Sequence, residues 1–180
     1  MTKLLVDDHA EVDALFRDLW REFDGGDARE VFSKLDYLWA RLAVHIRAEH
    51  LHLFPALLAA SERGRNEEVD EAPATEEVRI AVERLREDHD FFMRELAGAV
   101  NAARELAAQD VPPEHERLLQ IRGRAAAVAE RLVEHNRVEE QQVYLWPDAL
   151  LDRAELETLR AGVLREIENL PPRFPEKASG

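Results

Sequence analysis

Two histidine–glutamate pairs stand out because their residue types and spacing could do chemistry. His45 is followed by Glu49, and His135 by Glu139, each at a spacing of four residues. On a helix, residues four apart lie on one face, one turn above the other. Each pair can therefore aim an imidazole and a carboxylate at a single point, and the repeat predicts a site built from two copies of one arrangement.

A lone histidine precedes each pair, His9 before the first and His89 before the second, which completes an H…HxxxE…H…HxxxE pattern. Imidazoles and carboxylates without a thiolate suit iron or manganese, and zinc is possible. Six protein groups would over-fill one ion, whereas two bridging glutamates could serve two ions. The pattern therefore predicts a two-metal site with the ligands His9, His45, Glu49, His89, His135 and Glu139.

Taken one at a time, these residues have ordinary explanations. A histidine on an apolar stripe is usually a satisfied core residue, and a single HxxxE can be a pair on a helix surface. Without a metal, however, the six residues on inward faces would bury two carboxylates and four imidazoles together. Such burial costs several kcal/mol for each unpaired charge, so the set as a whole favours metal binding.

The elements that must position these residues are helices. Apolar residues recur at helical spacing in five stretches, and the composition is rich in Ala, Leu, Glu and Arg. We expect an all-α fold, an antiparallel up-down-up-down four-helix bundle with an extra short C-terminal helix. It forms one domain over residues 1–170, followed by a flexible tail at 171–180. The expected helices span about residues 6–24, 28–61, 76–108, 113–145 and 153–169.

The spacing along these helices also predicts which histidines meet. Short turns after the first and third helices make antiparallel neighbours. The first turn lies about 15 residues, roughly 22 Å, from His9 and about 17 residues, roughly 26 Å, from His45. The third-to-fourth turn lies about 20 residues from His89 and 22 from His135, or roughly 30 and 33 Å. His9 is therefore expected beside His45, and His89 beside His135.

Composition limits the possible partners and the compartment. The net charge of −14 argues against binding to nucleic acid or to an anionic membrane surface. The chain has no cysteine, which excludes disulfides, zinc–thiolate sites, iron–sulfur clusters and thiol catalysis. The sequence holds no apolar run long enough for a membrane span or a signal peptide. We expect a cytoplasmic protein that is a monomer or a weak homodimer.

Further polar residues lie close to the two pairs. His52 and its counterpart Gln142 are candidates for outer positions around the metals or at the mouth of a pocket. Tyr144 follows the second pair as Phe54 follows the first, and aromatic core packing is expected for it, with a phenol near the metals as the alternative. His50 is expected to point away from the site.

These residues resemble the hemerythrin-like family, also called the HHE cation-binding domain, over about residues 3–149. The runs HxxxExxxxFP and HxxxExxxxYxWP strengthen the resemblance. It implies an antiparallel four-helix bundle with a non-haem di-iron centre, oxo- or hydroxo-bridged, in which both glutamates bridge two iron ions. Manganese and zinc are less favoured than iron.

The sequence differs from the oxygen-carrying members of that family at two places. Those proteins have a second histidine four residues after the third-helix ligand, where this chain has Met93. They also have an aspartate five residues after the last histidine, where this chain has Glu139 at four. The symmetric pattern is more similar to iron-centre repair proteins of nitrosative stress, to an iron-sensing ubiquitin-ligase domain and to mycobacterial-type proteins with peroxide activity.

Several functions remain open from the sequence. The first is a di-iron protein that binds or reacts with oxygen, peroxide or nitric oxide, with weak peroxidase-, catalase-like or nitric-oxide-directed activity. The second is an iron store, an iron sensor or an iron-centre repair protein in oxidative or nitrosative stress, and the third is reversible oxygen binding. A ferritin-like oxidase is disfavoured, because it needs paired ExxH motifs and only Glu49-x-x-His52 fits.

Overall fold

The computed structural model describes residues 2–63, 72–109 and 115–169, and within these ranges the chain is helical apart from short connections. No strand occurs in these ranges. The helices are α1 (Thr2–Gly25), α2 (Ala28–Ala48), α3 (Phe54–Glu62), α4 (Thr75–Ala107), α5 (His115–Gln141), α6 (Trp146–Leu150) and α7 (Arg153–Glu168), with a π-helical segment at Glu49–Leu53 and a 3₁₀ turn at Val143–Leu145.

The first turn shows how the sequence reverses the chain. Gly26 has φ +73°, a conformation that glycine adopts without strain. Asp27 then caps α2, because its carboxylate accepts hydrogen bonds from the backbone N–H groups of Arg29 and Glu30 at 2.9 and 3.4 Å. Since this turn is so short, α1 and α2 pack side by side in opposite directions.

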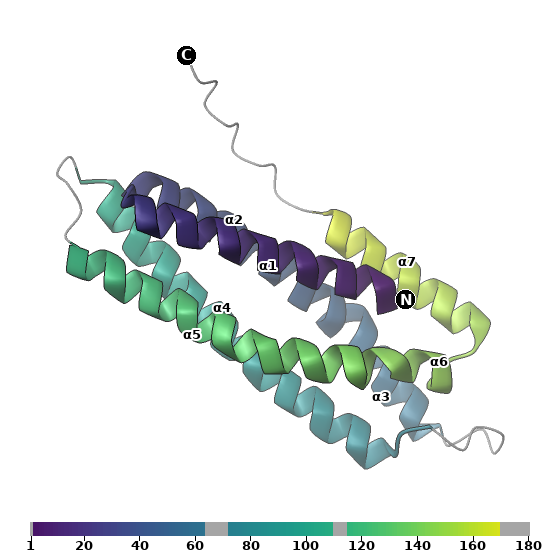
Figure 1. Ribbon diagram of the computed structural model, residues 1–180. Coiled ribbons are helices and arrows are strands. Elements are labelled where there is room, and N and C mark those ends of the chain that lie inside the picture. The colour runs from purple at the N-terminus through teal and green to yellow at the C-terminus, as the bar shows by residue number, and fades with distance from the viewer. Residues whose placement is uncertain (1, 64–71, 110–114, 170–180) are drawn as a thin grey trace.

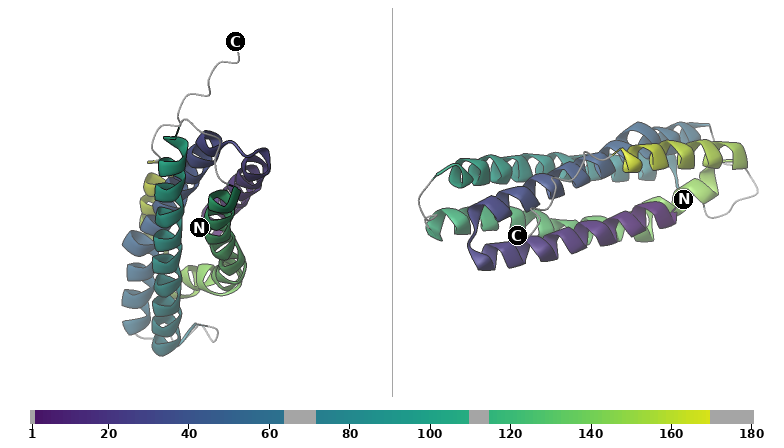
Figure 2. Two further views of the ribbon diagram at one scale, coloured as in Figure 1. Left: turned by 90° about the vertical axis from the view of Figure 1, so that its left-hand side faces the viewer. Right: turned by 90° about the horizontal axis from the view of Figure 1, so that it is seen from above.

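Four long helices form a closed bundle. Helix α2 packs against α1 and α4, and α5 packs against α4 and α1. The long helices run lengthwise beside one another (Figure 1), and the two turned views show the same arrangement (Figure 2). Helix α7 lies outside the four and packs on α2 and on the π-helical segment. The expected all-α bundle with an extra C-terminal helix is therefore confirmed.

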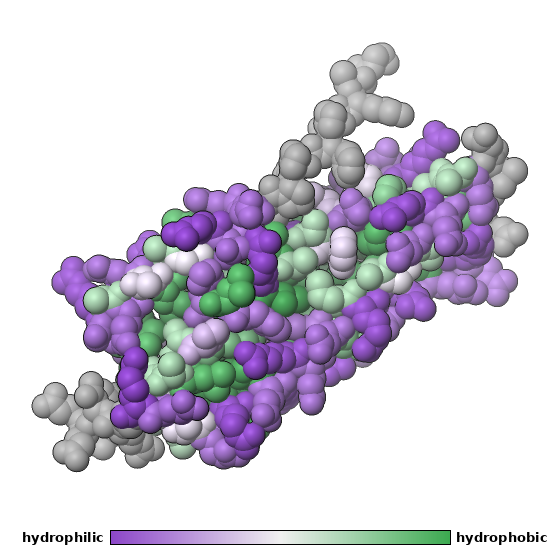
Figure 3. Space-filling model, turned by 180° about the vertical axis from the view of Figure 1, so that it is seen from behind, coloured by the Kyte–Doolittle hydropathy of each residue, from purple (hydrophilic) through white to green (hydrophobic). Residues whose placement is uncertain are grey.

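The core consists of two apolar layers with a polar layer between them. On α1, buried Leu5 belongs to one apolar layer, and Val12 and Phe16 belong to the other. His9 lies between these two groups, and the candidate ligands interrupt α2, α4 and α5 in the same way. From behind, polar side chains line the margins of the molecule while apolar ones show along its middle (Figure 3). The apolar layers thus keep water from the polar layer.

The helix expected over residues 28–61 is not a regular α-helix. It widens into the π-helical segment at Glu49–Leu53, where the backbone N–H of Phe54 bonds to the carbonyl of Glu49. Pro55 follows in the first turn of α3 and has no N–H to donate. The chain therefore accommodates the proline by a local widening of the helix.

The helix expected over residues 113–145 ends earlier than predicted. Its last α-helical residue is Gln141, and Gln142 has φ −134° and ψ −70°, outside the helical region. Pro147 was expected to end this helix. It instead occupies the first turn of the short α6. The correction follows from proline chemistry, because a residue without an N–H fits a helix start, where that N–H has no partner.

The C-terminal helix agrees closely with its predicted range. Asp152 and Glu155 form a capping box at its start, with Asp152 accepting from the Glu155 backbone at 2.9 Å. The predicted tail at 171–180 and most of the loop before α4 lie outside the described residues. No helix among the described residues is long and apolar enough to cross a lipid bilayer.

Candidate metal centre

All six predicted ligands meet in the polar layer of the bundle. His9 comes from α1, His45 from the last turn of α2, and Glu49 from the start of the π-helical segment. His89 comes from α4, and His135 and Glu139 from α5. Each of the six side chains is buried, and both glutamates are fully shielded from solvent. Whether each residue binds metal stays a prediction, but their convergence is a property of the fold.

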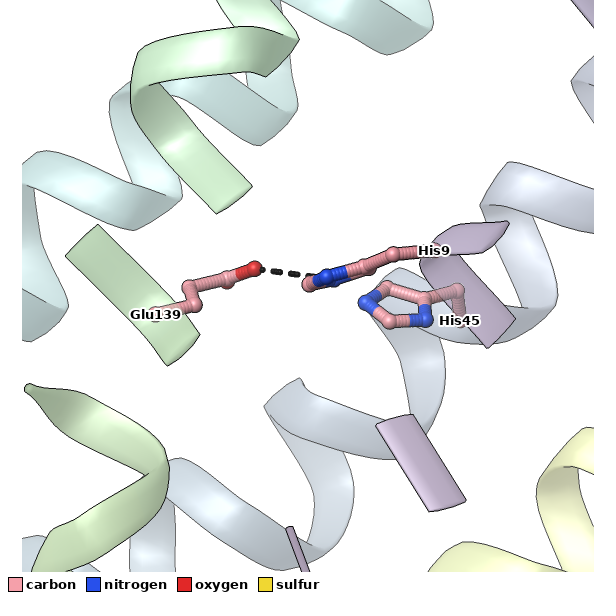
Figure 4. Close-up of side chains that lie close together, drawn as sticks. All are labelled: His9, His45 and Glu139. Atoms are coloured by element: carbon pink, nitrogen blue, oxygen red, sulfur yellow. Dashed lines mark ion pairs between the residues drawn. The ribbon is translucent and has the colours of Figure 1, made fainter. Parts of the chain in front are cut away.

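The expected histidine pairs are present. The rings of His9 and His45 lie 4.9 Å apart between centroids, and those of His89 and His135 lie 4.7 Å apart. Both pairs have ring nitrogens close to Glu139, so that two three-residue groups could each hold a metal ion. His9, His45 and Glu139 reach toward one another from three different helices (Figure 4). The two groups share Glu139.

Both glutamates lie between the two histidine pairs. Glu139 has Oε2 3.2 Å from Nε2 of His9 and Oε1 3.1 Å from Nε2 of His135. Glu49 has Oε1 3.6 Å from Nε2 of His45 and Oε2 3.3 Å from Nε2 of His89. Each carboxylate therefore offers one oxygen to each pair, which is the arrangement that a bridging ligand requires.

Aspartates hold one histidine of each pair from behind. Asp8 Oδ2 lies 2.8 Å from Nδ1 of His45, and Asp88 Oδ2 lies 3.1 Å from Nδ1 of His135. A carboxylate only accepts hydrogen bonds, so Nδ1 carries the proton and Nε2 of the neutral ring is left with a lone pair. That lone pair faces the centre of the polar layer, as metal binding requires.

The aspartates are in turn held by arginines. Arg41 pairs with Asp8, and Arg131 donates from Nε to Oδ1 of Asp88 at 2.6 Å. These four residues were not among the predicted site residues, yet their signal is present in the sequence. An aspartate directly precedes each lone histidine, and an arginine stands four residues before each HxxxE, so the repeat is DH…RxxxHxxxE in both halves.

The remaining two histidines have different outer partners. Nδ1 of His9 lies 2.8 Å from Oε1 of Glu140, whereas Nδ1 of His89 lies 2.9 Å from Nε2 of His50. His50 was expected to point away from the site. Its ring instead contacts His89. The π-helical segment widens the turn after Glu49, and this brings the His50 ring toward α4. The two halves of the centre thus differ at this point.

One carboxylate oxygen of each central glutamate lacks a hydrogen-bond donor. Oε2 of Glu49 and Oε1 of Glu139 are buried without a hydrogen-bond partner among the described residues, although imidazole nitrogens lie close to both. Buried oxygens of this kind are costly unless something positive lies between them and the nitrogens. Lone pairs from imidazoles and carboxylates that converge on common points fit metal ions well.

The proximity of these groups shifts their pKa values in opposite directions. Burial lowers the pKa of His89 well below 6.5. Burial also acts downward on His45 and His135, but the neighbouring carboxylates outweigh it and raise both pKa values. Burial and then the charge of Glu139 raise the pKa of Glu49, while the surrounding histidines overcome burial and hold the pKa of Glu139 well below 4.5. Without metal, the centre therefore keeps protons that a cation would displace.

Tyr144 has a different position from the one expected. It is buried with the apolar residues of one layer, but its hydroxyl lies 2.7 Å from Oε1 of Glu49 and 3.1 Å from Oε2 of Glu139. The phenol thus reaches the centre, which was the alternative to aromatic core packing. No periodicity argument could show this, because the helix breaks at Gln142 before Tyr144.

His52 and Gln142 take no part in the centre in this structure. The ring of His52 faces α7, with Nε2 3.8 Å from Glu166, and packs directly against Gly162. Gln142 donates to Glu77 at 3.0 Å on the surface. The two residues were candidates for outer positions around the metals, and they do not occupy them, because the widened turn at one site and the helix break at the other turn them outward.

A small cavity lies among the four imidazoles. Its volume, counted as the space open to the centre of a water molecule, is about 10 Å³. This is about the smallest volume that holds one water molecule. Besides the histidines, it is lined by Val12, Leu42, Leu132 and Asn136. The space beside the candidate ligands therefore suits a molecule of two or three atoms and excludes larger organic substrates.

Comparison with known proteins agrees with this arrangement. The family model described as the hemerythrin HHE cation binding domain matches residues 1–146, a range that includes all six converging residues. No curated protein and no solved structure matches the chain. The matched family implies a cation site with histidine and glutamate ligands.

Proposed function

The chain belongs to the hemerythrin HHE cation-binding domain family, and on that premise we propose that its polar layer holds two iron ions that bind or react with small oxidants. The oxidants are oxygen, peroxide or nitric oxide. When bound, two neighbouring iron ions supply redox chemistry and exchangeable positions for such molecules. The protein supplies the ligands, their orientation and an environment without bulk water.

The observation that carries the proposal is the position of the two glutamates. Glu49 and Glu139 each direct one oxygen toward either histidine pair, so that two ions could share both carboxylates. Each ion would then receive two imidazoles and two carboxylate oxygens. Four protein donors leave positions for small ligands, since iron in such sites commonly binds more than four groups.

The surroundings of the centre support a small oxidant in particular. The cavity beside the imidazoles holds about 10 Å³, and three of its four other lining residues are apolar. An apolar wall favours uncharged diatomic molecules, and Asn136 offers the one amide in that lining. A larger substrate would have to displace core side chains.

Reversible oxygen carriage is less well supported. Met93 stands one turn beyond His89, where a fifth histidine would be needed, and packs among the apolar residues instead. Each ion would therefore have about the same number of imidazoles and its own exchangeable position. We expect such a centre to oxidise in air rather than to bind and release oxygen.

One observation favours iron sensing as an alternative to reaction with small oxidants. The six converging residues come from all four bundle helices, so that metal would join the helices and its loss would loosen them. A sensor would use that loosening as its output, without turnover of an oxidant. The two functions therefore differ in reactivity and share the metal.

The test is metal analysis followed by rapid mixing. Protein purified in air is expected to contain two iron ions per chain. After reduction without oxygen, stopped-flow mixing with oxygen should oxidise the iron in one direction, and peroxide should be consumed slowly. A spectrum restored by removing oxygen would revive the carrier function, two irons without any reaction would favour the sensor, and a chain without iron under iron loading would overturn the proposal.

A further inference from the structure

The hydroxyl of Tyr144 lies among the donors of one candidate metal position. Besides the two glutamate oxygens at 2.7 and 3.1 Å, it has Nε2 of His9 at 3.2 Å and Nε2 of His45 at 3.4 Å. The side chain is 1% exposed. Both of these histidine nitrogens come from the His9–His45 pair, so the hydroxyl of Tyr144 lies at that half of the centre.

Four possible acceptor atoms surround the hydroxyl of Tyr144, which has one proton to donate. Nδ1 of His45 faces Asp8, and Nδ1 of His9 faces Glu140. Because a carboxylate holds each Nδ1, Nε2 of each ring faces the phenol and offers it a lone pair when the ring is neutral. One O–H group can donate to one acceptor, while four acceptor atoms surround the oxygen. This excess of lone pairs has to be offset by protons or by a cation, and around a metal ion the phenol oxygen becomes one more donor directed at a common point.

The spacing of the atoms agrees with that arrangement. Oxygen and nitrogen ligands lie about 2.0–2.2 Å from an ion such as zinc, so neighbouring ligands at right angles stand roughly 3 Å apart. The hydroxyl of Tyr144 stands 2.7–3.4 Å from all four atoms. Resting on the proposed two-metal site, we propose that Tyr144 binds, as a phenolate, the metal ion that His9 and His45 hold.

Binding displaces the phenol proton. The O–H bond of Tyr144 breaks, the oxygen keeps the electron pair and forms the bond to the metal ion, and the proton leaves to solvent. No oxidant or reductant is needed. The ion gains an anionic donor, and the net charge of the centre falls by one because the proton is released.

The other half of the centre has no such group. Phe54 occupies the matching place, five residues after Glu49, and its ring stacks on His89 at 5.9 Å between centroids. The ion between His89 and His135 would therefore have one protein donor fewer. The two metal positions are then unequal despite the symmetric ligand pattern, and the half that contains Phe54 keeps one more exchangeable position for a small oxidant.

Zinc binding tests the assignment without iron or activity. The chain has two tyrosines, Tyr37 and Tyr144, and near neutral pH an ordinary phenol is un-ionised because its pKa is about 10. Adding zinc to the metal-free Tyr37→Phe variant should produce the ultraviolet difference spectrum of one phenolate per chain. The Tyr144→Phe variant should give no such spectrum while circular dichroism shows it folded.

Iron gives a second readout. Ferric wild-type protein and Tyr37→Phe should show a phenolate-to-iron band in the visible range, and Tyr144→Phe should lose that band while retaining two irons. Two irons per chain without the band, or a band that persists in Tyr144→Phe, would overturn the ligand assignment and leave the proposed function standing. Zinc binding to the Tyr37→Phe variant without phenolate formation would also overturn it, whether or not Tyr144→Phe folds.

Discussion

In His45 and His135, the hydrogen bond at Nδ1 determines where Nε2 points. Asp8 and Asp88 accept from His45 and His135, and each aspartate is itself the neighbour of a candidate ligand in the sequence. One dipeptide in each half thus supplies a ligand to the centre and an orienting group to the adjacent helix. Because each Asp-His dipeptide has both roles, the two halves share the same DH and RxxxHxxxE spacing.

The Asp88→Asn substitution tests this orienting role. An amide is a weaker acceptor than a carboxylate and can present its NH₂ group to His135, so the ring loses its preferred tautomer. Loss of such an outer partner commonly lowers metal affinity about 10–100-fold. We expect a decrease in that range in a competition titration with a metal chelator. Asp88 is the better choice because its partner Arg131 is more exposed than Arg41 and is less disturbed.

The matched control is Asp13→Asn, at an exposed position on α1. It makes the same change of charge without facing the centre, so the metal affinity should stay close to that of the wild type. Equal affinities of Asp88→Asn and Asp13→Asn would show that the hydrogen bond between Asp88 and His135 does not govern metal binding.

The sequence was sufficient for the six converging residues and insufficient for their surroundings. Helical periodicity placed His45 and Glu49 on one face, and helix lengths brought His9 to their level. The same periodicity turns His50 away from Glu49, and only the widened turn brings it to His89. Tyr144 follows a helix break, where periodicity no longer applies.

At the scale of elements, the π-helical segment has a positioning role. It begins at Glu49 and leads into Phe54, which stacks on His89, while His50 reaches the same ring from beside it. Widened turns of this kind are frequent at functional sites. Two contacts with His89 thus follow from one local departure from α-helical geometry, which no propensity scale predicts.

Helix α7 depends on a glycine where it covers this segment. A Cβ added at Gly162 would stand 2.6 Å from Nδ1 of His52. We therefore expect Gly162→Ala to destabilise the fold, because overpacking costs about 1–3 kcal/mol and outweighs the gain in helix propensity. Chemical denaturation monitored by circular dichroism measures the change in the free energy of unfolding.

Gly123→Ala is the matched control, since a Cβ there meets no atom within 4 Å. Replacing a glycine inside a helix by alanine should stabilise it by about 1 kcal/mol. In a His52→Ala background, Gly162→Ala should also become stabilising, because the clash is gone. If Gly162→Ala is destabilising to the same extent in both backgrounds, contact with His52 is not the cause.

The arrangement of helices was predictable because short turns and amphipathic stripes leave few alternatives. The Gly25–Gly26 turn forces α1 and α2 together, and Leu159 and Val163 on α7 are buried as the stripe predicts. The breaks within the helices were not predictable, since Pro55 and Pro147 each permit either a kink or a new helix start. The outcome depends on tertiary packing around the centre.

At the scale of the whole molecule, the stability of the fold depends on whether the polar layer binds protons or metal ions. Two apolar layers enclose four imidazoles and two carboxylates, so each ionisation change there affects the folded state more than the unfolded chain. Metal and protons compete for the same atoms. Stability as a function of pH should therefore differ in sign between the metal-free and the metal-loaded protein.

For the metal-free protein, the sign follows from His45 and His135. Their folded-state pKa values are raised above 6.5, so their contribution to stability is complete below pH 6.5 and is lost as the pH rises through the folded values. The lowered pKa values of His89 and Glu139 act below pH 6.5 and 4.5, outside this window. From pH 6.5 upward, the metal-free thermal midpoint should therefore fall.

For the metal-loaded protein, the same ionisations have the opposite effect. Metal binds the unprotonated ligands, so its affinity rises with pH, and a ligand of the folded state stabilises it according to that affinity. The difference in thermal midpoint between metal-loaded and chelator-treated protein should widen steadily from pH 6.5 upward, measured by differential scanning fluorimetry in buffers of equal ionic strength. A constant difference would mean that metal displaces no protons from these imidazoles, and would place the cation somewhere other than the polar layer.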